Sequence, residues 1–284
     1  MNPKELVSGV VRLVSLPEVC LRVSEMLEDP GVSTAELGRV ISRDAGLTAR
    51  LLKIVNGESY GFPARIETVS RAVEVVAVRE LRGLVLAASA IEAFARVPEN
   101  VLNLAHFWRH SVYCGVVAQL LAERCNVLHS ERLFVAGLLH DIGKLVIAHK
   151  LPDLAHEVTC RSIDEEQPDF VIEREVLGFD HADVGGALLQ EWQMPETLAG
   201  AVRHHHLPAM AGTVALDASL VHLADAITGM AEHGLDSESA SLPVDEYAWQ
   251  LSGLDGAIVE PVHEEAGRHF SEALETILPR SYIL

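Results

Sequence analysis

The chain has 284 residues and a formal net charge of −19, with 22 Lys and Arg against 41 Asp and Glu. Such an acidic chain is a poor binder of nucleic acid or of an anionic membrane surface, because neutralising phosphate groups requires clustered basic side chains. Hydrophobic residues make up 49% of the chain while Phe and Tyr are sparse, and this mixture favours packed helices over a β-sandwich. We therefore expect an all-α protein.

Helix signals recur through the first part of the chain. Ser33 and Glu36 form a capping box that opens one helix. Asp44 can cap the next helix, which is expected to stop at the Asn-Gly pair that follows it. Thr68 or Ser70 opens a further helix, expected to continue through residue 81. Apolar residues recur at helical spacing on the first two of these helices: Leu37, Val40, Ile41, Leu47, Leu51, Leu52 and Val55.

The second part of the chain also has the pattern of consecutive helices. We expect one helix over residues 105–123 and another over residues 130–139, the latter ending near Gly143. Two short helices are expected to close the chain. The helices between are punctuated by three prolines, which favour helix starts and boundaries: Pro152, Pro168 and Pro195.

Residues 98–100 mark a boundary, which predicts two domains, 1–98 and 99–284. The polar stretch at residues 234–243 is expected to be a loop. We find no internal repeat and no alternation typical of strands, so the predicted architecture is an N-terminal helical bundle followed by a second helical domain.

Cysteine usage and apolar runs bear on the compartment. The four cysteines form no CxxC pair, which predicts reduced thiols in a cytosol. The N-terminal stretch lacks the apolar core and cleavage site of a signal peptide. No uninterrupted apolar run reaches the ~18 residues that a membrane span needs, since Arg82 and Glu92 break the best candidate. These features predict a cytoplasmic protein without a membrane span.

Histidines and aspartates in the second domain form a suggestive series. His140 and Asp141 are adjacent at the end of an apolar run, so a helix end can aim both side chains at one centre. Imidazole nitrogen and carboxylate oxygen are the ligand types that suit divalent Fe, Mn, Zn and Ni. The carboxylate can also bridge to a second ion, so one or two ions are expected. The candidate ligands are His110, His140, Asp141, His181, His205, His206 and Asp225.

A simpler explanation competes with this one for any single histidine, because a lone buried histidine is usually a hydrogen-bonded core residue. An order of single His, His-Asp, single His, His-His and Asp is much harder to obtain by chance. Eight other histidines fit the simpler explanation: His106, His129, His149, His156, His222, His233, His263 and His269.

Residues 138–145 (LLHDIGKL) resemble the signature of the HD superfamily of metal-dependent phosphohydrolases. His110, the His140-Asp141 pair and Asp225 match the H…HD…D ligands of that superfamily. More specifically, the chain resembles the HDOD family, the HD-related output domain of bacterial signalling, over roughly residues 10–230. The matching segments are Leu16-Pro17, 41–52, Asn56-Gly57, Tyr60-Gly61, 178–185, 192–195 and 202–208. The resemblance implies a helical bundle packed on an HD-like helical domain, and a regulatory rather than catalytic role.

Other details resemble catalytic relatives. His181, with a glycine four residues later, is similar to the H-x-x-x-G element of HD-GYP phosphodiesterases, and His205-His206 align with their His-His pair. The Gly-Tyr-Pro element itself is missing. Lys144 matches the lysine of HD-x-G-K, where a cation can offset the charge of a bound phosphate. We therefore assign Asp141 and Lys144 as candidate catalytic residues, while Lys144 can also be an ordinary solvated residue.

Three functions remain in competition. The first is a regulatory output module that binds a metal and a signalling protein or a small phosphorylated ligand, such as a nucleotide. The second is an active metal-dependent phosphohydrolase or phosphodiesterase. The third is a DNA-binding regulator, since residues 33–56 have the outline of a helix-turn-helix. The charge of −19 disfavours the third, and the family resemblance places the first slightly ahead of the second.

Overall fold

The computed structural model describes residues 2–8, 18–27, 29, 31–56, 65–76, 81, 85, 89, 94, 101–233 and 244–277. Within these ranges the chain is helical and contains no β-strand, which confirms the all-α class. The expected domain boundary at residues 98–100 and the expected loop at residues 234–243 lie outside the described residues. The motif segments Leu16-Pro17 and Tyr60-Gly61 also lie outside them.

The N-terminal region begins with short helices whose starts follow local capping chemistry. Ser33 caps α3 through the predicted capping box with Glu36, and the Asp44 carboxylate accepts a hydrogen bond from the Leu47 N–H at the start of α4. Thr68 caps α5, as one of the two predictions had it. The helices are α1 (Pro3–Ser8), α2 (Glu18–Met26), α3 (Thr34–Ile41), α4 (Ala45–Val55) and α5 (Val69–Val75).

The predicted length of α5 is wrong. The helix ends at Val75, and Val76 adopts an extended conformation, with φ −90° and ψ 133°, instead of continuing through residue 81. The run of β-branched valines at residues 73, 75 and 76 explains the early end, because such side chains lose rotamer freedom in a helix and favour extended backbone.

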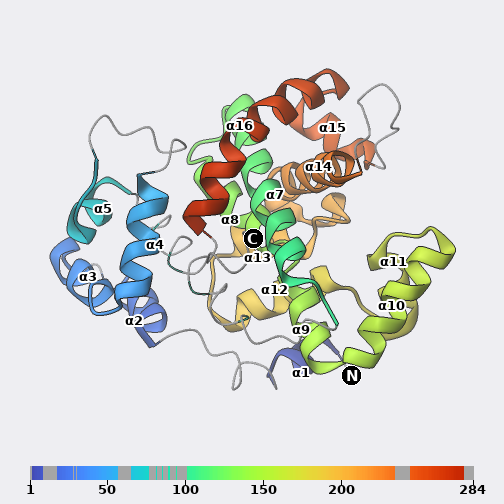
Figure 1. Ribbon diagram of the computed structural model, residues 1–284, viewed down its shortest axis with the longest axis horizontal. Coiled ribbons are helices and arrows are strands. Elements are labelled where there is room, and N and C mark those ends of the chain that lie inside the picture. The colour runs from blue at the N-terminus through green and yellow to red at the C-terminus, as the bar shows by residue number, and fades with distance from the viewer. Residues whose placement is uncertain are drawn as a thin grey trace.

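The C-terminal region is built around α7, which packs against α8, α14 and α16 (Figure 1). The predicted helix starts at the three prolines are confirmed, since Pro152 begins α10, and Pro168 and Pro195 immediately precede α11 and α13. The helices are α7 (Leu104–Arg124), α8 (Glu131–Leu139), α9 (Ile142–Lys150), α10 (Pro152–Glu165), α11 (Asp169–Leu177), α12 (His181–Glu191), α13 (Glu196–Arg203), α14 (Ala215–Glu232), α15 (Glu246–Ser252) and α16 (Val259–Ile277).

Two boundaries in this region differ from the prediction. The helix predicted over residues 130–139 ends at Leu139 as expected, but Gly143, which was expected to lie near its end, lies inside a new helix that starts at Ile142. The apolar pattern continues across the break, so periodicity alone does not reveal the restart. The final helix, α16, has 19 residues rather than being short. Pro261 lies in its first turn, where a missing N–H breaks no intrahelical hydrogen bond.

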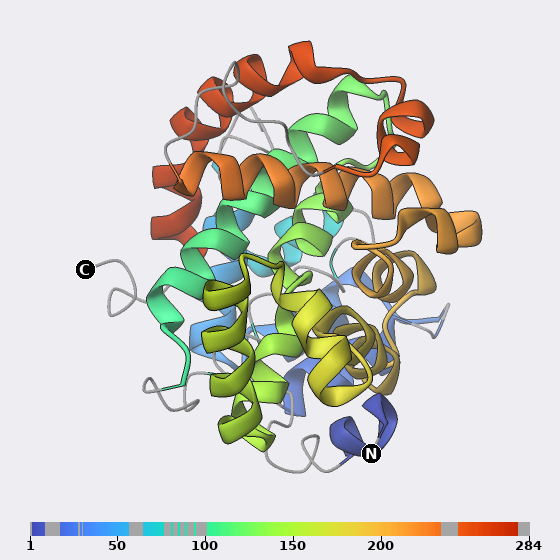
Figure 2. The same cartoon turned by 90° about the vertical axis from the view of Figure 1, so that its right-hand side faces the viewer.

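The N-terminal helices pack directly on the C-terminal region, as an N-terminal bundle on an HD-like helical domain should. Helix α4 contacts α16, and α1 contacts α12 and α9. Figure 1 shows α2 to α5 on one side of the central helices and the pair α10–α11 on the other. In the view of Figure 2, α10 and α11 stand in the foreground, at the outside of the molecule.

One helix among the described residues is long and apolar enough to cross a membrane. This segment, Gly212–Glu232, includes α14, and 67% of its most apolar window is buried inside the protein. Asp217 and Asp225 interrupt its apolar run, so it does not meet the requirement of an uninterrupted apolar run used for the sequence. Burial of this kind is typical of the core helix of a globular protein.

Two glycine crossings bring the central helices unusually close. A Cβ atom at Gly137 of α8 would lie 2.8 Å from the Cα of Gly115 in α7. A Cβ atom at Gly143 of α9 would lie 2.8 Å from the backbone nitrogen of Gly185 in α12 and would overlap the carbonyl oxygen of His181. Real Cβ atoms do not approach other atoms this closely, so both crossings require glycine. Each crossing lies about one helical turn from a candidate metal ligand.

Candidate metal centre

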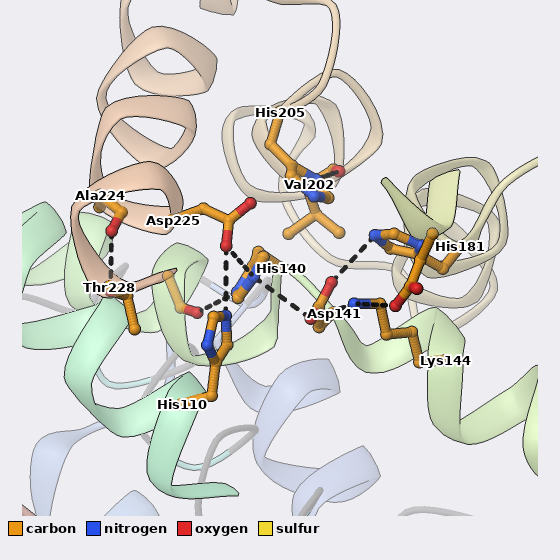
Figure 3. Close-up of polar contacts among 12 residues, drawn as sticks. His110, His140, Asp141, Lys144, His181, Val202, His205, Ala224, Asp225 and Thr228 are labelled. Atoms are coloured by element: carbon orange, nitrogen blue, oxygen red, sulfur yellow. Dashed lines mark hydrogen bonds and ion pairs between the residues drawn. The ribbon is translucent and has the colours of Figure 1, made fainter. Parts of the chain in front are cut away.

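The seven candidate ligands, distant in sequence, converge on one site between the helices. Figure 3 labels all of them except His206. His110 extends from α7 and Asp225 from α14, while the His140-Asp141 pair occupies the break between α8 and α9. His181 is the first residue of α12. His205 and His206 follow the end of α13. The fold therefore brings together every residue that the sequence nominated as a metal ligand.

The site consists of three overlapping triads, in each of which the possible ligand atoms lie within 4.8 Å of one another. His110, His140 and Asp225 form one triad, which we call the core half-site. His181, His205 and His206 form another, which we call the hairpin half-site because it contacts α11, which packs against α10. Asp141 joins His140 and His205 in the third triad.

Asp141 connects the two half-sites through its two oxygens. Its Oδ1 lies 2.9 Å from His181 Nε2, and its Oδ2 lies 3.5 Å from His140 Nε2. A carboxylate that offers one oxygen to each side has the geometry of a bridge between two ions. Asp225 is confined to the core half-site, where its Oδ1 is 3.2 Å from His110 Nε2 and 3.5 Å from His140 Nε2.

Hydrogen bonds on the outer side of the rings fix the orientation of four histidines. The Nδ1 atoms of His140 and His205 each lie 2.7 Å from the carbonyl oxygen three residues earlier. The Nδ1 atom of His110 lies 3.1 Å from Glu232, and that of His181 lies 2.6 Å from Glu173. Carbonyl and carboxylate oxygens only accept, so each Nδ1 donates a proton and each Nε2 faces the centre.

Two of these inward nitrogens have no hydrogen-bond partner. His140 and His205 are 0% exposed, and the Nε2 atom of each is buried without a donor or acceptor. An unpaired buried polar atom is destabilising by about 1–3 kcal/mol. Because each Nδ1 donates outward, the neutral ring of either histidine presents a lone pair at Nε2, and a metal ion coordinated there would satisfy both atoms. The residues present therefore fit a metal of the class that histidine and carboxylate ligands select.

In the hairpin half-site, the contacts of His181 also fit a bound cation. Its Nε2 lies 2.9 Å from Asp141 Oδ1 and 2.8 Å from His206 Nε2, while its Nδ1 is already engaged with Glu173. His181 Nε2 thus lies within hydrogen-bond distance of both a carboxylate oxygen and another imidazole nitrogen. Such a group requires a cation between its members, either a proton or a metal ion.

The ionisation of the site reflects its excess of buried carboxylates. Burial alone would lower the pKa of His110 and His181, but Asp225 and Glu232 raise that of His110 to about 9, and Glu173 and Asp141 raise that of His181 to about 10. Burial raises the pKa of Asp225, but the hydrogen bond that it accepts from His110 and its close contact with His140 hold it well below its ordinary value. The site therefore demands positive charge.

His205 and His206 behave in the opposite way. Burial, assisted by the positive charges of His140 and His181, lowers the pKa of His205 to about 3. The pKa of His206 also falls well below its ordinary value, first because it is buried and then because of its neighbours His205 and His181. Both rings therefore remain neutral near pH 7, which is the state in which imidazole binds metals.

Lys144 lies inside the site rather than in solvent. Its Nζ is 3.0 Å from Asp141 Oδ2 and 3.4 Å from Asp169 Oδ2, and its side chain is 25% exposed. Burial would lower its pKa, but the charges of Asp141 and Asp169 outweigh burial and raise it. The ammonium group is therefore charged, but two carboxylates already balance it.

The residues that hydrogen-bond or pair with the candidate ligands and with Lys144 were not predicted from the sequence. Glu173 and Glu232 each back a histidine, and Asp169 pairs with Lys144. His222, one of the eight histidines expected to be ordinary, donates from Nδ1 to the His205 carbonyl and accepts at Nε2 from the Asp245 N–H. A signal existed for Glu232, which lies two helical turns after Asp225 and therefore on the same face.

The fold and the site together define a class: helical proteins with a His-Asp pair at a helix break, facing further histidines and an aspartate from neighbouring helices. Comparison with known proteins then gives the family. The HDOD domain model matches residues 13–208, so the chain belongs to the HDOD family, as the sequence motifs indicated.

A curated relative without an assigned function comes from Treponema pallidum and is 29% identical over 196 residues, or 68% of this chain. The match spans only 37% of that relative's length. Two solved structures share the fold. An HDOD domain protein of unknown function from Geobacter sulfurreducens has a TM-score of 0.73 and 24% identity, over 97% of this chain and 98% of its own. A protein from Shewanella amazonensis SB2B, provisionally named a phosphohydrolase, has a TM-score of 0.74 and 23% identity, over 96% and 98%.

Proposed function

We propose that this chain is a cytoplasmic bacterial signalling output protein whose His/Asp centre holds one or two divalent transition-metal ions, with Fe, Mn, Zn and Ni as candidates. In this proposal the centre regulates by binding a small phosphorylated ligand, such as a nucleotide, or a partner signalling protein. One observation carries the metal: the inward Nε2 atoms of His140 and His205 are fully buried and unpaired, with ring orientations fixed from behind.

Each residue has a role in this proposal. The core half-site would hold one ion, the hairpin half-site a second, and Asp141 would be shared between them. A bound ion would supply a Lewis acid that attracts and polarises a phosphate oxygen. Lys144 lies beside Asp141 and offsets part of the negative charge of the carboxylates around the site.

The state of Lys144 supports regulation ahead of catalysis. A lysine that stabilises charge developing on a phosphate must be free to approach it, whereas here Asp141 and Asp169 hold the ammonium group at 3.0 and 3.4 Å. Phosphoester hydrolysis remains the second candidate, because the ligand set is complete and Lys144 lies beside it.

Metal content is the first test. Protein purified without chelators should contain a transition metal by elemental analysis, at one or two ions per chain. Metal content near zero in the wild-type chain would contradict the proposal.

A panel of phosphomonoesters, nucleotides and cyclic dinucleotides, assayed with the metal-loaded wild-type chain, separates the two candidates, and the Asp141→Ala chain is the blank. Binding without turnover supports the regulatory role. Turnover above the blank that is abolished by chelation, and is reduced more than metal binding by Lys144→Ala, supports the phosphohydrolase.

We keep the proposed division into domains 1–98 and 99–284. DNA binding by the first of these domains is disfavoured. Helix α4, which a helix-turn-helix would present to DNA, packs against α16 and α5 instead. We expect no sequence-selective binding to duplex DNA at physiological salt. Sub-micromolar selective binding in a filter or anisotropy assay would restore the DNA-binding hypothesis.

A further inference from the structure

Glu173, in the middle of α11, is a buried carboxylate directed at the metal centre. Its side chain is 5% exposed, and its Oε2 accepts two hydrogen bonds from one residue: from the backbone N–H of His181 at 2.7 Å and from Nδ1 of the same histidine at 2.6 Å. The two bonds fix both the start of α12 and the rotation of the His181 ring.

Burying a carboxylate is costly unless a positive charge compensates for it. His181 can supply that charge in two ways, by carrying a second proton or by binding a cation through Nε2. A carboxylate hydrogen-bonded to Nδ1 makes the opposite nitrogen of the ring a stronger ligand, and such partners commonly affect metal affinity by about 10–100-fold. Glu173 therefore has the position and the charge of a ligand-orienting residue.

The rest of the inner face of α11 also contacts the site. Asp169 pairs with Lys144, and the Phe170 ring stacks on His206 with ring centres 4.1 Å apart and an interplanar angle of 16°. Residues 169, 170 and 173 share one helical face. Helix α11 packs mainly on α10 and α12, away from the central helices. The hairpin half-site therefore receives its outer support from a peripheral element.

Resting on the metal centre proposed above, we propose that Glu173 is the positioning residue of His181, so that occupancy of the hairpin half-site depends on α11 remaining in place. The core half-site provides a matched comparison. Glu232 lies 3.1 Å from Nδ1 of His110 and has the same role there, but it extends from α14, the helix that also carries Asp225.

The experiment is a cobalt(II) titration of the full-length, metal-free chain, followed by visible absorption. The variants are Glu173→Gln and Glu232→Gln, which keep side-chain shape and remove charge. We expect Glu173→Gln to weaken one binding step by about tenfold or more and to leave the other within about twofold of wild type. Glu232→Gln should weaken the other step.

Phe170→Leu provides a second variant for the same half-site and leaves Glu173 intact. It should weaken the step that Glu173→Gln weakens, by a smaller factor, because it loosens α11 without removing the hydrogen bonds to His181. Circular dichroism of each metal-free variant checks that the helices are retained.

The outcomes separate the two proposals. If the wild-type chain takes up no cobalt, the metal centre itself is overturned, and the role of Glu173 with it. If the wild type binds cobalt but Glu173→Gln binds it equally well, only the positioning role is overturned. Equal weakening of the same step by Glu173→Gln and Glu232→Gln would also contradict it, because the two carboxylates would then not serve separate half-sites.

Discussion

The core half-site and the hairpin half-site use the same side chains on different supports. In the core half-site the ligands extend from α7, α14 and the end of α8, which pack on one another in the centre of the protein. In the hairpin half-site they lie at the start of α12 and after α13, and the outer helix α11 covers them. The difference in support suggests a comparison: the ligands of the core half-site are held by central helices, whereas those of the hairpin half-site depend on the outer helix α11.

Asp141→Ala should have the largest effect and should remove the distinction between the half-sites, because Asp141 contacts both. We expect metal affinity to fall at least about 100-fold, since even an outer hydrogen-bond partner can contribute that much. Elemental analysis after dialysis measures it. Asp217→Ala is the control, because it removes a buried aspartate that pairs with Arg132 outside the three triads. Equal metal loss in both variants would show a general folding defect.

Gly143→Ala should separate α9 from α12 and so damage the hairpin half-site selectively. The new Cβ would overlap the His181 carbonyl oxygen, and overpacking of this kind typically lowers the free energy of unfolding by about 1–3 kcal/mol. We expect denaturant melts to shift by that amount and cobalt binding to weaken mainly in the step sensitive to Glu173→Gln.

Gly229→Ala is the control for that substitution. This glycine lies within α14, and a Cβ there meets nothing within 4 Å. Alanine should therefore stabilise the helix by about 0.5–1 kcal/mol. If Gly143→Ala is equally well tolerated, the close crossing of α9 and α12 is not required.

Metal binding should be coupled to proton release in both half-sites. His110 and His181 have pKa values of about 9 and 10 in the metal-free chain, above the ordinary value, so both rings carry a proton at pH 7.5. A metal ion must displace that proton, so affinity should fall as pH falls from 9 to 7, by about tenfold per unit for each proton displaced. Calorimetry in buffers of different ionisation enthalpy counts the protons. Heats that do not depend on the buffer would contradict this coupling.

His222→Ala should have the smallest effect and should not separate the half-sites. The substitution removes two hydrogen bonds, one to the His205 carbonyl and one from the Asp245 N–H, each contributing about 0.5–1.5 kcal/mol. We expect a corresponding fall in thermal stability and only a slight weakening of both cobalt steps. Strong loss of one step alone would mean that His222 fixes His205 more tightly than these bonds imply.

The candidate ligands could be named from the sequence, whereas most of the residues that contact them from behind could not. The order of the His140-Asp141 pair and the later histidines along the chain would rarely arise by chance, so it identified them as candidate ligands. Glu173 lies in a helix next to other acidic residues such as Glu175, and only the docking of α11 decides which of them reaches His181. That docking depends on contacts between separate helices, which no local pattern encodes.

The fold shows the same division between local and distant causes. Capping side chains act within three or four residues, so the starts of α3, α4 and α5 were predicted correctly. The end of α8 at Leu139 was predicted, but the restart at Ile142 was not, because Gly143 suggested a helix end rather than a helix start. His140 and Asp141 occupy the two positions between these helices, so the break lies at the candidate metal site.

The contact between His110 and Asp225 joins residues 115 positions apart. An ion that needs both can bind only after α7 and α14 have docked. If this docking follows the folding transition state, metal will slow unfolding more than it speeds folding. At a free metal concentration 100 times the dissociation constant, the native state would gain about 2.7 kcal/mol. The centre would then act as a kinetic lock on the helices that surround it, and chelation would shorten the lifetime of the folded chain.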